Sequence, residues 1–269
     1  YLDNIEPATG SIYGKIPNSC QDDVEQAVNA AEKALPAWRA MPLEARADIL
    51  YAIAQGIESK LEELALAESI DNGKPVSLAK MVDIPRAASN FKFFAHACSQ
   101  FASESHSMTN TATNYTLRQS IGIVGCISPW NLPLYLFSWK IAPALAAGNC
   151  VIAKPSEITP KTAAMLGQIC QDAGLPKGVL NILHGTGNSV GSAICNHKKI
   201  KAISFTGGTK TGAAIATQLA PQFKKLSLEL GGKNPALVFS DCDFDDTVEQ
   251  VFKASFANQG QICLCASRI

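Results

Sequence analysis

The sequence lacks an excess of charge of either sign, with 23 basic and 23 acidic side chains among 269 residues. A field that attracts nucleic acid or an anionic membrane is therefore not expected. Long hydrophobic runs are also missing, because Pro, Gly, Asn or Lys interrupts every apolar stretch well before the ~20 residues that cross a bilayer. No positively charged and then apolar leader opens the chain. These absences favour a cytoplasmic protein that binds neither nucleic acid nor membrane.

Patterns typical of metal sites and disulfide frameworks are scarce. The nine cysteines form no paired CxxC motif, and the four histidines are scattered. Only Cys195 and His197 bring two metal-capable side chains close together, which is weak support for zinc. We therefore expect reduced thiols and no metal site.

Both ends of the sequence predict that it is part of a longer protein. It begins at Tyr1 rather than Met, and it stops at Ile269 where a strand is predicted to begin. At ~150 residues per domain, its length corresponds to between one and two domains.

The first hundred residues have the apolar spacing of amphipathic helices. The pattern covers residues 21–68, with a predicted interruption at Pro36 and an end at Asn72-Gly73. A further helical stretch over residues 76–101 contains Pro85, which predicts a kink or break. Residues 103–119 are rich in Ser, Thr and Asn, which predicts an exposed strand or hairpin whose edge suits a homo-oligomer, the alternative being a plain solvated excursion.

Five short apolar runs then alternate with helical stretches. The runs cover residues 121–127, 150–153, 179–183, 202–205 and 226–230. Such a rhythm predicts an α/β fold, with a parallel, Rossmann-like sheet and flanking helices. Because ligands of such sheets bind beyond the carboxyl ends of the strands, the residues after each run are the candidates for chemistry.

The ends of the first three runs carry polar and glycine-containing segments. Ser128-Pro-Trp-Asn131 follows the first run without the glycine turn of the usual dinucleotide fingerprint. Residues 154–157 end the second run, where Lys154 and Glu157 suit ribose hydroxyls or form a surface ion pair. Gly185-Thr-Gly187 follows the third run, but Gly191 comes one residue too late for the fingerprint, so a simple turn is an alternative.

The later segments carry a second glycine turn, a carboxylate and a thiol. Residues 205–212 combine glycines with a helix start, which suits a pyrophosphate or an ordinary capped turn. Glu229 lies in an apolar strand just before paired glycines and is a candidate general base, because a carboxylate is costly to bury without a role. Cys263 follows a glycine-containing turn and is a candidate nucleophile, the alternative being a small core residue.

Taken together, these segments resemble the NAD(P)-dependent aldehyde dehydrogenase superfamily, from near Asn4 to the final residue. The motifs that carry the resemblance are Pro129-Trp130-Asn131, residues 154–157, Phe205-Thr206-Gly207, residues 228–233 and Gly260-Gln261-Ile262-Cys263. The resemblance implies an NAD-binding domain over residues 1–102 and 121–231. It further implies an oligomerisation hairpin over residues 103–120 and the start of a truncated catalytic domain over residues 232–269.

The resemblance also implies catalytic roles. Cys263 corresponds to the nucleophile that attacks the aldehyde carbon, and the Asn131 side-chain amide with the Cys263 N–H would hold the oxyanion. Glu229 corresponds to the base that activates water to release the acid from the thioester. Transfer of the acyl group to coenzyme A is an alternative, against which Glu229 argues.

The implied cofactor is NAD, which Glu157 favours over NADP because a carboxylate disfavours an added 2′-phosphate. Gly208 stands where many members of the superfamily have serine, which removes one hydroxyl donor. The residues expected to contact the cofactor are Ile127, Ser128, Trp130, Lys154, Ser156, Glu157, Gly187, Thr206, Gly207, Gly208, Gly212 and Leu230.

Within the superfamily the chain resembles the 2-aminomuconic and 2-hydroxymuconic semialdehyde dehydrogenases, in residues 83–86, 90–94 and 262–268. Their substrates carry a carboxylate, which an arginine at the position of Arg86 holds by forked hydrogen bonds. A plain helix-surface arginine is the alternative reading. The expected activity is oxidation of such a semialdehyde in the breakdown of aromatic compounds, including the kynurenine pathway, by a homo-oligomer of two or four subunits.

Two motifs of the superfamily are absent from the 269 residues. One is the Glu-x-Phe-Gly-Pro segment that touches the nicotinamide ribose, and the other is the second substrate arginine of the subgroup. The sequence therefore leaves open a different class of function, in which this portion is an inactive nucleotide-binding or interaction module.

Overall fold

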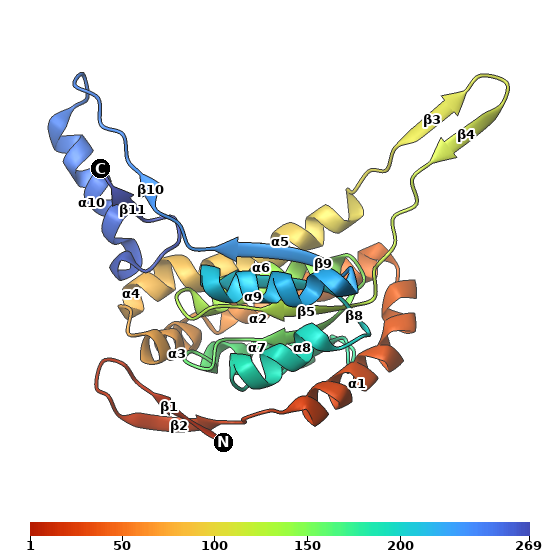
Figure 1. Ribbon diagram of the computed structural model, residues 1–269, viewed down its shortest axis with the longest axis horizontal. Helices are drawn as coiled ribbons and strands as arrows, with labels where there is room; N and C mark the ends of the chain where they lie inside the picture. Colours follow the sequence, from red (N-terminus) through yellow and green to blue (C-terminus); the bar gives the residue numbers. More distant parts are fainter.

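The computed structural model describes residues 1–269 and is built around a parallel sheet of five strands (Figure 1). The strands are β5 Ile123–Ile127, β6 Cys150–Lys154, β7 Leu180–Ile182, β8 Ile200–Gly207 and β9 Lys225–Leu230. Their order across the sheet is β7-β6-β5-β8-β9, and every neighbouring pair is parallel. The predicted α/β fold and all five predicted strands are confirmed.

Helices cover both faces of the sheet. The helices of the chain are α1 Gln21–Ala40, α2 Leu43–Ser59, α3 Leu61–Asn72, α4 Val76–Leu78, α5 Ile84–Ser99, α6 Pro133–Ala146, α7 Lys161–Asp172, α8 Ser192–Asn196, α9 Thr209–Leu219 and α10 Phe244–Phe256, of which α10 lies away from the sheet. Helices α6 and α7 pack on one face with α2, α3 and α5 outside them, whereas α1, α8 and α9 pack on the other. This is the arrangement that right-handed crossovers produce when a chain winds outward in both directions from a central strand.

The hydrophobic core lies between the sheet and these helices, in one cluster of 45 buried residues. Every residue of β5 and β6 is buried. Their sequences are continuous apolar runs because helices cover both of their faces. Close packing extends to Gly125, where an added Cβ would lie 2.6 Å from the Ile203 side chain.

The helical region before the sheet corrects one expectation and confirms another. The predicted interruption at Pro36 is wrong, because α1 continues through it to Ala40. Trp38, only 1% exposed, anchors the last turn in the core, and this packing outweighs the backbone hydrogen bond that a proline removes. The predicted kink or break at Pro85 takes the form of a π-helical turn over Ala79–Asp83, after which Pro85 lies in the first turn of α5; the backbone stays helical on both sides of this turn.

Two parts of the chain project from the body (Figure 1). The antiparallel hairpin of β3 Ser105–Met108 and β4 Ala112–Tyr115 is exposed at every strand residue, as predicted. The segment after β9 contains β10 Asn234–Pro235, α10 and β11 Ala266–Arg268. No helix has both the length and the apolar composition needed to cross a bilayer. A further antiparallel hairpin, β1 Leu2–Ile5 with β2 Ile12–Ile16, precedes α1.

Candidate active site

The order of the sheet reverses between β5 and β8. From β5 the chain winds outward through β6 to β7, and it then returns beside β5 to form β8 and β9. A crevice is expected beyond the carboxyl ends of two strands that diverge in this way. Ser128 follows β5 and Gly207 ends β8, so the segments selected from the sequence meet at this edge.

The turn after β8 presents open backbone. Gly208 is the N-cap residue of α9, no side chain caps the helix, and a Cβ on Gly208 would meet nothing within 4 Å. The first N–H groups of α9 therefore remain available, with the partial positive charge of a helix N-terminus. Gly212 lies against Leu230, since an added Cβ would come 2.5 Å from the leucine Cδ2. These two residues let α9 approach β9 closely and so position the turn.

The end of β6 holds a buried lysine and its acidic partner. Lys154 Nζ lies 2.8 Å from Glu157 Oε2, and it also donates to the Pro155 carbonyl at 2.9 Å. Burial tends to raise the pKa of Glu157, but the hydrogen bond and charge of Lys154, with the Gly187 N–H, bring it below its ordinary value. Glu157 is therefore an ionised acceptor at neutral pH. A Cβ on Gly187 would also meet nothing within 4 Å.

The segment after β5 contains two buried polar atoms without a partner, the Ser128 hydroxyl and the Asn131 side-chain oxygen. The Ser128 N–H donates to the Lys154 carbonyl at 3.1 Å, which ties the ends of β5 and β6 together. The Ser128 hydroxyl is buried and has no hydrogen-bond partner. Such an atom is rare in a folded protein and indicates that another group completes its hydrogen bonding. Trp130, two residues on, is 41% exposed.

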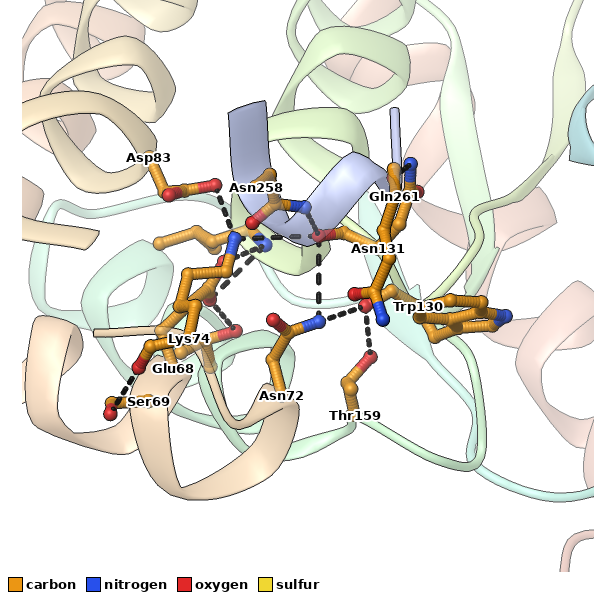
Figure 2. A network of polar contacts seen from close by, with 12 residues as sticks. Glu68, Ser69, Asn72, Lys74, Asp83, Trp130, Asn131, Thr159, Asn258 and Gln261 are labelled. Carbon is orange, nitrogen blue, oxygen red and sulfur yellow. Dashed lines mark hydrogen bonds and ion pairs between the residues drawn. The ribbon is translucent and has the colours of Figure 1, made fainter. Parts of the chain in front are cut away.

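Three side chains converge on the backbone carbonyl of Asn131 (Figure 2). Asn258 Nδ2 donates to it at 3.0 Å, Lys74 Nζ at 3.3 Å and Asn72 Nδ2 at 3.4 Å. Lys74 is in turn paired with Asp83 at 2.8 Å, and both side chains are almost fully buried. The carbonyl therefore has a fixed position, and with it the backbone from which the Asn131 side chain extends.

The Asn131 side chain reaches the loop that carries Cys263. Its Nδ2 donates to the Gln261 carbonyl at 2.7 Å, as Figure 2 shows from close by. The Cys263 thiol is exposed, and the Cys263 carbonyl accepts from Asn234 Nδ2 at 2.6 Å. The structure thus brings together an amide and a thiol-bearing loop that are 130 positions apart at the hydrogen bond. An amide donor bonded to a loop that also carries an exposed thiol suits addition of sulfur to a carbonyl group.

Glu229 lies on the edge strand β9, opposite Thr206 of β8, and is exposed. Its charge acts on Lys140 of α6, whose ammonium donates to the Ser204 hydroxyl at 3.1 Å. Burial lowers the pKa of Lys140, and the nearby Cys126 and Glu229 oppose that effect. The carboxylate therefore lies on the α6 side of the sheet. No hydrogen bond links it to Asn131 or to the Cys263 loop.

Arg86 extends from α5 toward α6. Its guanidinium carbon lies 5.5 Å from the ring centroid of Tyr135 and 5.2 Å from that of Trp139. Tyr135 follows Asn131 by four residues, so this cation lies near the same end of α6 as the amide described above.

Comparison with known proteins identifies the family. The sequence model of the aldehyde dehydrogenase family matches residues 1–269. The chain belongs to the aldehyde dehydrogenase family. It is 50% identical over 270 residues to the 2-aminomuconic semialdehyde dehydrogenase of Homo sapiens, covering 100% of this chain and 55% of that protein. It is 45% identical over 274 residues to the 2-hydroxymuconic semialdehyde dehydrogenase of Pseudomonas sp. (strain CF600), covering 100% of this chain and 56% of the other.

Solved aldehyde dehydrogenases share the fold. The NAD⁺ complex of an aldehyde dehydrogenase from Bacillus cereus superposes with a TM-score of 0.97 at 35% identity, over 99% of this chain and 55% of that one. The family resemblance found in the motifs is therefore confirmed. The chain spans about half the length of the aldehyde dehydrogenases that it matches.

Several residues of this candidate site were not selected from the sequence. Asn72, Lys74, Asp83, Asn258 and Gln261 all belong to the network around Asn131. The available signal was an Asn-Gly pair that ends a predicted helix, with a lysine directly after it. Cys195 and His197, which gave weak support for a zinc site in the sequence, have different surroundings. Cys195 is buried in the core, whereas His197 Nε2 lies 2.9 Å from Glu25 Oε2.

Proposed function

We propose that the complete protein oxidises a carboxylated semialdehyde, of the 2-aminomuconic or 2-hydroxymuconic type, to the acid with NAD as the oxidant. The observation that carries the proposal is the hydrogen bond from Asn131 to the Cys263 loop. It joins an amide donor to the loop that carries an exposed thiol. The names of relatives that are 50% and 45% identical support the substrate class.

The carboxyl edge of the sheet fits a dinucleotide. The N-terminus of α9 at Gly208 suits the pyrophosphate, since its backbone N–H groups are free and no side chain fills the space. Lys154 and the ionised Glu157 suit the ribose hydroxyls. The unpartnered Ser128 hydroxyl is a further donor at this edge. Bound NAD would supply the hydride acceptor.

The chain's own residues carry the remaining steps. The Cys263 thiolate attacks the aldehyde carbon, because the thiolate and not the thiol is nucleophilic. Asn131 Nδ2 has a second hydrogen beyond the one donated to Gln261, and it stabilises the oxyanion together with the Cys263 N–H. After oxidation leaves a thioester on Cys263, Glu229 takes a proton from water so that hydroxide releases the acid. Arg86 binds the distal carboxylate of the substrate.

Kinetics of the complete protein test this proposal. With NAD and 2-hydroxymuconic semialdehyde, the unaltered enzyme should form NADH, and Cys263→Ala should abolish it. Cys265→Ala is the matched control, since this second thiol donates to the Ala257 carbonyl at 3.6 Å and should be dispensable. Activity that survives in Cys263→Ala would contradict the assignment of the nucleophile.

The acceptor of the acyl group needs a separate measurement. Glu229→Gln should give a first burst of NADH and then slow turnover, because the thioester forms but is not hydrolysed. Acid release at the full rate in Glu229→Gln, or a requirement for coenzyme A in the unaltered enzyme, would refute water activation by Glu229.

We further propose that the complete protein is a cytoplasmic homo-oligomer, a dimer or tetramer, joined partly through residues 103–120. The support is a hairpin whose strand residues are all exposed and whose edges are free to pair. Light scattering on protein that lacks residues 105–115 should give a lower mass than the unaltered protein, and an equal mass would refute this role.

A further inference from the structure

The Arg86 guanidinium is held by aromatic rings and by no acid. Its distances of 5.5 Å and 5.2 Å to the ring centroids of Tyr135 and Trp139 both lie in the range of a cation–π contact. The two rings are one helical turn apart on α6, and they meet edge-on with centroids 6.4 Å apart. The nine ion pairs of the chain do not include Arg86.

This arrangement leaves the guanidinium ready for an anion. Cation–π contacts use the faces of the rings, so they leave the N–H groups in the guanidinium plane free. A carboxylate partner from the chain would instead occupy those groups and would compete with a ligand. Arg86 is exposed and Trp139 is 44% exposed, so a solute can reach the pair.

A buried hydrogen-bond cluster fixes α5 against α6 beneath the rings. Asn90, one turn after Arg86, is 2% exposed and donates to the Ser138 hydroxyl at 2.9 Å and to the Tyr135 carbonyl at 3.2 Å. The Ser138 hydroxyl in turn donates to the Tyr135 carbonyl at 2.8 Å. The register that places Arg86 over both rings is therefore set from within the core, because these groups would be costly to leave unpaired.

We propose that Tyr135 and Trp139 are positioning residues that hold Arg86 for the distal carboxylate of the substrate. The inference rests on the proposed function, in which Arg86 binds that carboxylate. A side chain held by two ring faces loses less conformational freedom on binding, so the carboxylate binds more tightly. The rings also belong to the helix that follows Asn131, so one rigid element sets the span between the reacting carbonyl and the distal carboxylate.

The test compares a charged and a neutral substrate in the complete enzyme. Steady-state KM and kcat would be measured with 2-hydroxymuconic semialdehyde and with 2,4-hexadienal, which lacks the carboxylate. Tyr135→Leu and Trp139→Leu should each raise KM for the charged substrate about 3-fold, and the double variant about 10-fold. The KM for hexadienal and both kcat values should stay within about 2-fold, since an arginine clamp acts on binding of the carboxylate.

Two further variants make the result specific. Trp139→Phe keeps a ring face and should retain most of the preference for the charged substrate. Phe93→Leu removes an exposed ring of α5 that forms no cation–π pair with Arg86, and it should change neither KM.

The outcomes separate the positioning role from the proposed function. If Arg86→Ala raises KM only for the charged substrate but the leucine variants change neither substrate or both equally, the positioning role is overturned and the proposed function stands. If Arg86→Ala leaves KM for the charged substrate unchanged, the carboxylate-binding part of the proposed function fails and the positioning role with it. A selective rise in all these variants, with rescue by Trp139→Phe, supports both.

Discussion

The buried ion pair between Lys74 and Asp83 gives a quantitative prediction about stability. Lys74→Met removes the ammonium 2.8 Å from the Asp83 carboxylate, at a place where both side chains are at most 1% exposed. Burial already raises the pKa of Asp83, although Lys74 opposes the shift, so the carboxylate depends on its partner. Removing one member of a buried pair costs about 3–5 kcal/mol.

An exposed pair on the neighbouring helical turn is the matched control. Lys80 lies 2.6 Å from Glu62, with side chains 38% and 76% exposed. Lys80→Met should cost at most about 1 kcal/mol, because solvent screens an exposed pair. At roughly 2 °C per kcal/mol for a large domain, the thermal midpoint of the complete protein should fall by about 6–10 °C in Lys74→Met and by at most about 2 °C in Lys80→Met.

A double variant distinguishes an unpaired charge from a packing defect. Lys74→Met with Asp83→Leu removes both charges and should recover part of the lost midpoint, since replacing a whole buried pair with apolar groups is often neutral. Equal midpoints for Lys74→Met and Lys80→Met, or no recovery in the double variant, would refute the reasoning.

Two further predictions concern a buried carboxyl and a close backbone approach. Burial raises the pKa of Glu68 to about 7 from an ordinary value of 4.5. The contribution of this carboxyl to the free energy of unfolding is therefore full below about pH 4.5 and is lost as the pH rises through about 7. The loss amounts to about 3 kcal/mol. Glu68→Gln should therefore flatten the fall in thermal midpoint between about pH 5 and about pH 8, and an unchanged slope would contradict the burial argument. Gly178 and Gly174 have φ of +86° and +81°, but an added Cβ would lie 2.5 Å from the Ala30 carbonyl oxygen at Gly178 and would meet nothing within 4 Å at Gly174. Gly178→Ala should thus lower the free energy of unfolding by about 1–3 kcal/mol more than Gly174→Ala does, because of overpacking, and should show the lower thermal midpoint. Equal midpoints would show that the loop yields.

Local sequence patterns predicted the sheet because a strand that is buried on both faces has a nearly continuous apolar sequence. The apolar runs that became β5 and β6 needed no knowledge of their neighbours, and the carboxyl edge followed from the parallel order. Pro36 was misread because local propensity does not register the anchoring of Trp38 in the core. Tertiary packing decides in such cases.

The support of Asn131 was beyond prediction for a different reason. The donors to its carbonyl come from positions 57, 59 and 127 residues away, and no local pattern records a hydrogen bond of that range. Family motifs identified Asn131 and Cys263 but not the residues that hold them. The closest local signal was Gly73, whose left-handed φ of +82° ends α3 and turns Lys74 into the core.

The loop before Cys263 adopts a backbone conformation that needs external support. Asn258 and Gln259 have φ of +49° and +63°, values that L-residues seldom adopt and that cost of order 1–3 kcal/mol each. Asn258 donates to the Asn131 carbonyl at 3.0 Å, and Gln259 donates to the Gly73 carbonyl at 3.3 Å. The turn after α3 therefore bonds both to the Asn131 backbone, through Asn72 and Lys74, and to the strained loop before Cys263. This turn of the body thus contributes to the position of the Cys263 loop together with Asn234, which donates to the Cys263 carbonyl at 2.6 Å.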